Sequence, residues 1–285
     1  MSVHSVSNNH ISISVNSRGA ELISLKKEDK ERLWQSDSAV WARYAPVLFP
    51  VVGKLKENKF IFEGSSYNLP QHGFARDAEF NLLEHTKTGI EFELTADEDS
   101  LKVYPFHFSL RIAYELTEKG LNVKYKVFNP DKKDLLFSIG AHPGFKCKNL
   151  NDHYLEFEGR TEFIVEKLSD GLLSGETYRL KLENGRLPLN TKLFDNDALV
   201  FKNTQIEKVS LCSNNSSDKI VMTSDNWPYF GIWAKKGSDA FVCLEPWYGI
   251  ADPVDSTNDL RQKEGIIQLS PYKSFEVEFN IEIQN

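Results

Sequence analysis

The sequence predicts an all-β protein, a large antiparallel β-sandwich with few short helices. Ten segments alternate apolar with polar residues or are rich in β-branched and aromatic residues, as half-buried strands are. Clusters of turn-forming residues, such as 129–134 (NPDKKD) and 213–219 (SNNSSDK), separate several of these segments. Phenylalanine is abundant, at 19 residues, and large aromatic side chains suit the packing of one sheet on another.

In chain order, the predicted strands cover 10–17, 60–64, 89–96, 106–117, 120–129, 208–213, 219–224, 229–234, 240–245 and 275–284. With weaker candidates included, about eighteen strand-like runs follow one another without a linker, which favours one sandwich domain over residues 1–285. A β-propeller would repeat with a period of about 40–50 residues, and the chain shows no such period. Helical signals occur in two short segments, 36–45, which ends at Pro46, and 195–201.

Charge and cysteine content exclude several classes of protein. The net charge is −7, whereas nucleic-acid and membrane surfaces recruit clusters of lysine and arginine, so we expect neither as a partner. No apolar run approaches the stretch of about 20 residues that spans a bilayer, and the first residues lack the features of a secretory signal. Three cysteines without a CxxC motif predict reduced thiols and a cytoplasmic protein. Nothing in the sequence predicts an oligomeric state.

Motifs for common cofactors are missing. No GxG occurs among the 16 glycines, which excludes the dinucleotide-binding fingerprint and the phosphate-binding Walker loop. GxSxG and HExxH are also absent. The seven histidines are dispersed along the chain, without the tight spacing of metal ligands. The sequence therefore predicts neither a cofactor nor a metal.

The segment 69–80 (LPQHGFARDAEF) is the first candidate for chemistry. In an extended chain, His72, Phe74 and Arg76 would face the same side, with Arg76 about 13 Å along the strand from His72. Gly73 would let the backbone approach another segment closely. The alternative is a turn histidine beside a surface arginine.

The segment 135–145 (LLFSIGAHPGF) is the second candidate. A strand of apolar and small residues ends at His142, and Pro143 keeps this histidine in an extended conformation. Small neighbours leave room around the imidazole ring, which packing alone does not explain. The alternative is a histidine with a purely structural role.

The segment 240–256 (AFVCLEPWYGIADPVDS) is the third candidate. Glu245 ends an apolar strand, and Pro246 follows it as Pro143 follows His142. Burial would raise the pKa of this carboxyl group towards useful basicity. Trp247 could stack on a sugar ring, while the carboxylate accepts hydrogen bonds from hydroxyl groups. Together, His142 and Glu245 could form a general acid/base pair; the alternative is a glutamate that caps a loop.

The blocks FPVVGK, HGFAR, GAHPGF, DALVF and LEPWYGIAD, in this order, resemble those of the aldose 1-epimerases, or galactose mutarotases, and most of all their LacX-like bacterial branch. The resemblance runs from 18–25 (RGAELISL) to 269–279 (LSPYKSFEVEF). It implies a large antiparallel β-sandwich of the galactose-mutarotase type, with an open cleft across one sheet.

The resemblance also implies roles for individual residues. His142 matches the catalytic acid of the family, Glu245 its general base and His72 its second active-site histidine. Asp197, in DNDALVF, is similar to the substrate-binding aspartate.

Two positions depart from the typical pattern. The family carries an arginine upstream of the first histidine, and Lys54 stands near that place here. Typical members have His-Gly-Gly where this chain has His72-Gly73-Phe74, and the HGFAR form with Arg76 is shared with a hexose-6-phosphate mutarotase branch, in which the arginine contacts phosphate.

We therefore expect a mutarotase that interconverts the α and β anomers of an aldohexose, with the polar tips of His142 and Glu245 about a sugar-ring width apart. A neutral free sugar is favoured over a 6-phosphate, because one arginine in a protein of net charge −7 makes a weak phosphate site. A non-catalytic sugar-binding protein is one alternative. A glycoside hydrolase is another, and would need a second carboxylate such as Asp252 or Asp255.

Overall fold

The computed structural model describes residues 2–284, which form a large antiparallel β-sandwich with few short helices. This confirms the predicted fold class. Each of the ten segments predicted as strands contains or overlaps a strand. The structure adds strands that the sequence pattern did not single out, most of them short or at the edges of sheets.

Two large sheets and a smaller one make up the molecule. The nine-stranded sheet has the order β18 (Arg186–Pro188), β15 (His153–Glu156), β20 (Lys208–Ser213), β21 (Ser216–Thr223), β25 (Ser274–Gln284), β11 (Gly120–Phe128), β10 (Ser109–Leu116), β9 (Gly89–Thr95) and β8 (Asn81–His85). The eight-stranded sheet has the order β17 (Leu172–Lys181), β16 (Glu162–Ser169), β19 (Leu199–Lys202), β22 (Tyr229–Trp233), β23 (Phe241–Tyr248), β13 (Ile139–Ala141) and β5 (Val47–Leu48), and β14 (Gly144–Lys146) also pairs with β23. The four-stranded sheet contains β1 (Val3–Ser7), β2 (Ile11–Asn16), β3 (Glu21–Lys27) and β4 (Lys30–Glu31).

Short elements complete the fold. Two small ladders pair β6 (Lys59–Phe62) with β7 (Ser65–Asn68) and β12 (Leu135–Phe137) with β24 (Ile267–Leu269). The helices are α1 (Glu98–Val103) and the 3₁₀ turns η1 (Lys56–Asn58), η2 (Ala75–Asp77), η3 (Leu150–Asp152), η4 (Thr191–Phe194) and η5 (Leu260–Gln262). None of the helices in the described part of the chain combines the length and apolarity that a membrane crossing requires.

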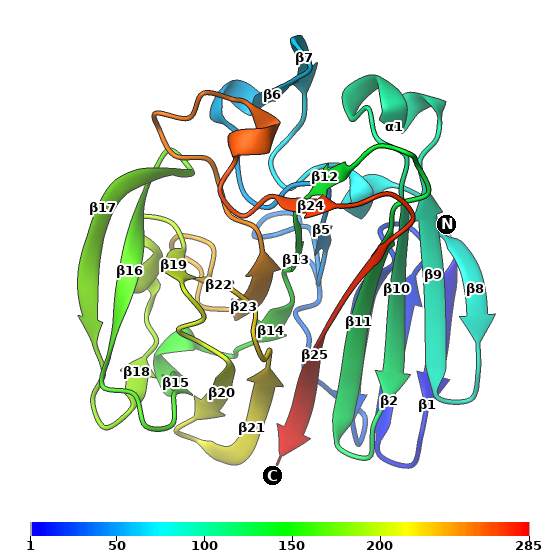
Figure 1. The fold of residues 1–285 in the computed structure, drawn as a ribbon. Coiled ribbons are helices and arrows are strands. Elements are labelled where there is room, and N and C mark those ends of the chain that lie inside the picture. The colour runs from blue at the N-terminus through cyan, green and yellow to red at the C-terminus, as the bar shows by residue number, and fades with distance from the viewer. Residues whose placement is uncertain (1, 285) are drawn as a thin grey trace.

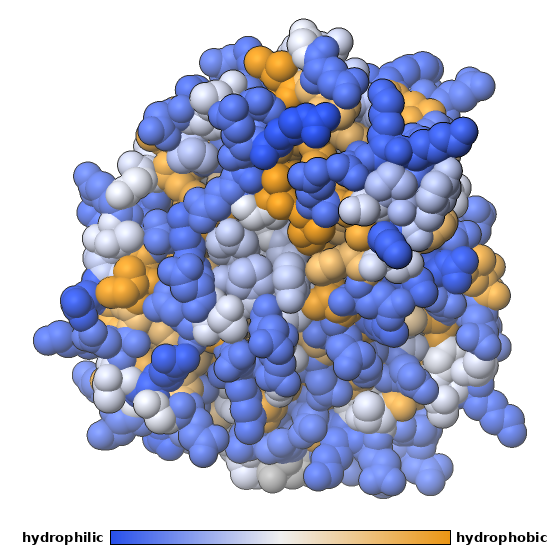
Figure 2. Space-filling view, in the orientation of Figure 1, coloured by the Kyte–Doolittle hydropathy of each residue, from blue (hydrophilic) through white to orange (hydrophobic). Residues whose placement is uncertain are grey.

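Alternation of side chains explains how the sheets pack. In β2, Ile11, Ile13 and Val15 are buried while the residues between them are partly exposed. The main hydrophobic cluster draws residues from nearly every element, from Val6 in β1 to Ile283 in β25. Figure 1 shows β8 to β11 and β25 side by side, with β1 and β2 behind them. The face seen in Figure 2 is mostly hydrophilic, with smaller groups of apolar residues.

The two predicted helices are wrong. Residues 36–45 form turns, because the carbonyl of Trp41 accepts hydrogen bonds from the Asp37 amide and the Trp34 indole. In the second segment, helix η4 ends at Phe194 and strand β19 begins at Leu199. Between them Asp197 adopts a positive φ of 80°, which a helix cannot contain.

Gly73 brings the segment of His72 against β5, as its sequence context predicts. It has a φ of +69°, and a Cβ atom there would lie 2.3 Å from the carbonyl oxygen of Phe49. The amides of Phe74 and Ala75 both donate to that same oxygen. A side chain at position 73 would therefore separate two backbone segments that hydrogen-bond to each other.

This close approach can be tested against a second glycine of similar conformation. Gly64, in the β6–β7 turn, has a φ of +79° and nothing within 4 Å of the added Cβ. We expect Gly64→Ala to lower the free energy of unfolding by about 1 kcal/mol, through backbone strain alone. Gly73→Ala should cost about 3 kcal/mol or more, because overpacking adds to the strain. Urea denaturation measures both, and equal losses would contradict the steric argument.

Candidate active site

One cavity of about 330 Å³ brings together residues that are far apart in the chain. Of the seven predicted site residues, six line this cavity: His72, Arg76, His142, Asp197, Glu245 and Trp247. Its volume is at the small end of the range for small-molecule sites. The cavity could therefore enclose a ligand of the size of a single sugar ring.

The strand register places His142 opposite Glu245. On one side of the pair, Gly140 in β13 is paired with Trp247 in β23. On the other side, Gly144 in β14 is paired with Cys243. Proline follows both titratable residues and has no amide hydrogen, so the ladder is interrupted at this point. The two segments that share this sequence pattern, an apolar strand followed by a titratable residue and a proline, thus lie opposite each other in the sheet.

Nε2 of His142 lies 3.2 Å from Oε2 of Glu245. The expectation that these tips lie a sugar-ring width apart is therefore wrong. A direct contact suits the chemistry better, because the ring oxygen and the C1 hydroxyl of a sugar are bonded to the same carbon. An acid and a base that act on those two oxygens have to be close to each other.

Burial sets the charge of this pair. Glu245 is 1 % exposed, and burial raises the pKa of its carboxyl group well above the usual value. Burial, assisted by the positive charges of Arg76 and Arg43, lowers the pKa of His142 to about 3. The free cavity therefore favours a protonated carboxyl group and a neutral imidazole.

Aromatic rings surround His142, although its neighbours in sequence are small. The ring of Trp41 lies 5.0 Å from the imidazole and is tilted by 30°. Trp233, in β22, and His72 meet it edge-on, at 5.6 Å and 5.8 Å. These contacts fix the plane of the imidazole and leave its side chain 11 % exposed.

Trp247 lies flat over two glycines on the neighbouring strands. A Cβ atom at Gly231 in β22 would be 2.3 Å from the indole, and one at Gly140 in β13 would be 2.7 Å from it. The two glycines therefore create the space in which the indole sits beside Glu245. Glycine in a strand interior often marks such a close approach.

Several buried polar atoms in the cavity have no hydrogen-bond partner within the described residues. They are Nδ1 of His142, Oε2 of Glu245, Nε1 of Trp247 and Nε of Arg76. Oε2 of Glu245 is close to His142 but is not aligned for a hydrogen bond with it. Buried polar groups are normally satisfied, so this concentration indicates a binding site for a polar ligand.

His72 is held by backbone groups. Its amide donates to the carbonyl of Gly53, at 3.0 Å, and the amide of Gly53 donates to its Nδ1, at 3.1 Å. Burial and the positive charges nearby lower the pKa of His72 well below the usual value. A neutral ring that accepts at Nδ1 carries its proton on Nε2. His72 is therefore a neutral donor in the wall of the cavity.

Arg76 reaches the cavity by a route that differs from the prediction. Residues 72–76 are not extended, because His72 and Gly73 both have positive φ and residues from Ala75 onward form η2. The guanidinium of Arg76 donates to the carbonyl of Gln71, at 2.6 Å. Burial lowers its pKa to about 10.

Trp41, Arg43 and Trp233 line the cavity but were missed in the sequence. Trp41 and Arg43 lie in the segment predicted to be a helix, and for that reason they were not considered as site residues. Arg43 donates to both carboxylate oxygens of Asp77, at 3.1 Å each. Trp233 lies near the end of a predicted strand, which was the only signal for it in the sequence. In the structure it is paired with Cys243, and Gly231, two residues earlier, is paired with Glu245.

The remaining predicted residues lie at or beyond the rim. Asp197 is exposed in the loop between η4 and β19, and its carboxylate accepts from the amide of Ala198. Lys54 is not among the lining residues, since its ammonium group binds the carbonyl and carboxylate of Asp170 at 2.8 Å. The geometry therefore does not support Lys54 as a substrate contact.

Metal-ligand atoms gather at one place in the described residues. A ring nitrogen of His142, Sγ of Cys243 and a carboxylate oxygen of Glu245 lie within 4.8 Å of one another. Burial raises the pKa of the Cys243 thiol well above its usual value, which keeps it protonated, and Arg43 and Arg76 line the same cavity. Both features oppose a dication, so we assign no metal here, and a metal-free mechanism stays a prediction.

Neither aspartate that the hydrolase alternative would use lies in the cavity. Asp252 is buried in an ion pair with Lys263, and Asp255 is exposed in the following loop. Neither residue lines the cavity. This arrangement gives no support to the hydrolase alternative.

Comparison with known proteins identifies relatives over the whole chain. The family model "Aldose 1-epimerase" matches residues 2–264. The chromosomal LacX protein of Lactococcus lactis subsp. lactis is 29% identical, with 98% of each chain covered. A galactose mutarotase related enzyme from Lactobacillus acidophilus has a TM-score of 0.95 at 34% identity, covering 100% of this chain and 98% of that one. A galactose mutarotase-like protein from Lactobacillus casei has a TM-score of 0.93 at 28% identity, covering 99% and 100%.

The titration of His142 provides a test of the cavity's electrostatics. Because its pKa is lowered to about 3, the ring should stay neutral as the pH falls from about 7 to about 5. A histidine with the ordinary pKa titrates near 6.5 in the same range. NMR spectra of the imidazole groups, assigned with His142→Asn, measure this. A midpoint near 6.5 for His142 would show that the cavity is much wetter than its geometry indicates.

Proposed function

The chain belongs to the aldose 1-epimerase family, and we propose that it interconverts the α and β anomers of an aldohexose. The observation that carries the proposal is the 3.2 Å contact between His142 and Glu245 inside a cavity of sugar size. No cofactor is required, because proton transfers accomplish the whole reaction.

In the proposed mechanism, Glu245 removes the proton from the C1 hydroxyl and His142 donates a proton to the ring oxygen. The bond between C1 and the ring oxygen breaks, which gives the open-chain aldehyde. Rotation about the bond between C1 and C2 then exposes the other face of the carbonyl. The hydroxyl at C5 attacks that face as the two protons return, and the opposite anomer is formed.

The neutral pair favoured in the free cavity supports the same reaction with the roles exchanged. A protonated Glu245 can donate to the ring oxygen while a neutral His142 accepts from the C1 hydroxyl. Either state contains one acid and one base, and each group has to serve in both roles because the reaction is reversible. The reaction therefore depends on the total number of protons that the pair carries, and not on which of the two residues carries them in the free enzyme.

Other residues of the cavity supply binding rather than proton transfer. Trp247 and His72 present neutral N–H donors suited to sugar hydroxyl groups. Trp41 and Trp233 provide apolar faces against which C–H groups of a sugar can pack. Neutral donors beside aromatic faces favour an uncharged sugar, so a free aldohexose is our first candidate.

Replacement of either member of the pair tests the mechanism. His142→Asn and Glu245→Gln should each slow mutarotation by about 10²-fold or more while the fold is kept, because each removes a proton carrier without changing the shape much. Polarimetry of freshly dissolved α-D-glucose and α-D-galactose measures the rate. If the parent protein binds a sugar but leaves the rate of rotation change unaltered, the protein is a sugar-binding module and the proposal fails.

A second candidate is a hexose 6-phosphate, and one observation favours it. Arg43 lines the cavity together with Arg76, so two guanidinium groups are present where the sequence indicated one. Asp77 offsets part of their charge, since it lies 3.1 Å from Arg43 and 3.9 Å from Arg76. The residual positive charge could hold a phosphate beyond the C1 end of the sugar.

Comparison of glucose with glucose 6-phosphate separates the two candidates. We expect kcat/KM for glucose to equal or exceed that for the phosphate. A preference of tenfold or more for the phosphate, lost in Arg43→Ala and in Arg76→Ala, would establish the second candidate instead. Arg18→Ala and Lys54→Ala are the controls, because Arg18 approaches Asp77 at 3.7 Å and Lys54 binds Asp170, yet neither lines the cavity.

A further inference from the structure

We propose that the buried ion pair of Asp252 and Lys263 is a positioning device that holds His72 in the tautomer with its proton on Nε2. The role of that tautomer as a donor to sugar hydroxyls rests on the proposed function. The two residues lie outside the cavity lining and act through the backbone of residues 53–56. They are positioning residues.

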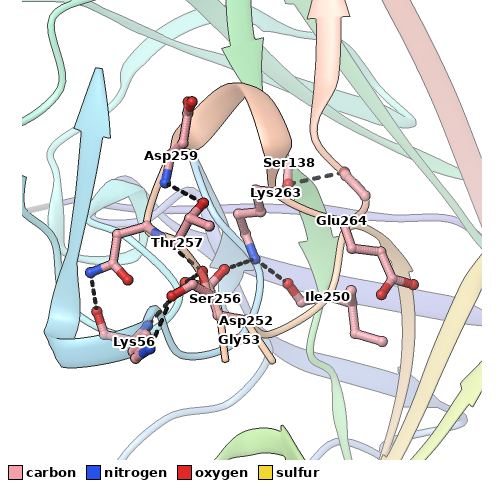
Figure 3. Close-up of polar contacts among 12 residues, drawn as sticks. Gly53, Lys56, Ser138, Ile250, Asp252, Ser256, Thr257, Asp259, Lys263 and Glu264 are labelled. Carbon is pink, nitrogen blue, oxygen red and sulfur yellow. Dashed lines mark hydrogen bonds and ion pairs between the residues drawn. The ribbon is translucent and has the colours of Figure 1, made fainter. Parts of the chain in front are cut away.

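The ion pair is almost completely enclosed. The side chains of Asp252 and Lys263 are each 3 % exposed, and Nζ of Lys263 lies 2.9 Å from Oδ1 of Asp252. Nζ also donates to the carbonyl of Ile250, at 2.6 Å. Figure 3 shows the ammonium group between these two oxygens, below the turn that contains Asp259 and Thr257. The pair thus ties the end of η5 to the segment that follows β23.

Asp252 connects this segment to two segments that lead into the cavity wall, residues 53–56 and the start of β17. Its Oδ2 accepts from the amide of Lys56, at 3.0 Å, and its own amide donates to the carbonyl of Lys54, at 2.9 Å. Its carbonyl accepts from the amide of Leu173 in β17, a lining residue, at 2.9 Å. One aspartate therefore sets the position of residues 54–56 and of the start of β17.

Gly53 transmits this position to His72. A Cβ atom at Gly53 would lie 2.6 Å from Cα of Ala251, so the two segments are in backbone contact. The amide of Gly53 donates to Nδ1 of His72, at 3.1 Å. An accepting Nδ1 leaves the single proton of the neutral ring on Nε2. The side-chain nitrogen of Gln71 lies 3.3 Å from Nε2, and two donors cannot bond, so this tautomer requires the amide of Gln71 to turn its oxygen towards the ring.

A buried ion pair suits this task better than apolar residues would. Such pairs contribute little to stability relative to well-packed hydrophobic groups, because desolvation offsets their attraction. They do favour one arrangement of the groups they join, since a shift of Asp252 would leave the ammonium group of Lys263 buried without its counter-ion. Loop conformations that withdraw the amide of Gly53 from His72 are thereby disfavoured.

The tautomer of His72 can be measured without any assay of activity. Long-range ¹H–¹⁵N spectra distinguish a ring with its proton on Nε2 from one with its proton on Nδ1, and His72→Gln assigns the signal. We expect the Nε2-protonated form alone in the parent protein and a mixture of both forms in Asp252→Asn and Lys263→Met. The control is Asp218→Asn, which breaks ion pairs with Arg32 and Lys30 away from the cavity and should leave His72 unchanged.

Kinetics provide the second measurement. In Asp252→Asn, kcat/KM for the sugar should fall about tenfold, mainly through KM, because the contact of His142 with Glu245 does not depend on this network. If the single variants do not fold, the double variant Asp252→Ala/Lys263→Met removes both buried charges and serves in their place. A His72 signal that stays in one tautomer in all these variants would overturn the inference. Absence of mutarotation in the parent protein would instead refute the proposed function and leave the tautomer result standing.

Discussion

The antiparallel pairing of β23 with β13 and β14 is the constraint on which the cavity depends. It sets Glu245 across from His142, and the prolines after both residues interrupt the ladder so that neither side chain is crowded by a continuous sheet. The same register places Gly140 beside Trp247, which gives the indole its space. A shift of β23 by one residue would turn Glu245 and Trp247 to the other face of the sheet, away from His142.

Low polarity around this pairing explains the electrostatics of the site. Burial raises the pKa of Glu245 and lowers that of His142 and of His72, so all three groups are held near neutrality. A cavity of neutral donors and acceptors binds hydroxyl groups without the cost of desolvating full charges. Mutarotation creates charge only transiently, on two oxygens bonded to one carbon, and adjacent neutral groups can neutralise it by moving protons over short distances.

The sequence predicted the strands well because period-2 alternation is a local signal. It predicted five of the cavity residues because their motifs combine titratable side chains with glycine and proline, whereas Asp197 came from the family resemblance alone. It failed where conformation depends on distant partners. Residues 36–45 carry helix-capping residues, but the amides of Tyr44 and Ala45 donate to the carboxylate of Glu21 and the carbonyl of Tyr44 accepts from the amide of Gly144, which no local pattern reveals. Likewise, the left-handed conformation of His72 follows from contacts with Phe49 and Gly53.

The architecture separates the chemistry of the site from its recognition of the ligand. His142 and Glu245 lie at the junction of paired strands in the centre of a sheet, where their geometry tolerates little change. His72, Arg76 and Asp197 lie instead on turns and loops, which are held by backbone hydrogen bonds and ion pairs. Loops accept substitution more readily than central strands do. Changes in the loops can therefore alter which sugar is bound, neutral or charged, while the proposed proton-transfer pair of His142 and Glu245 stays as it is.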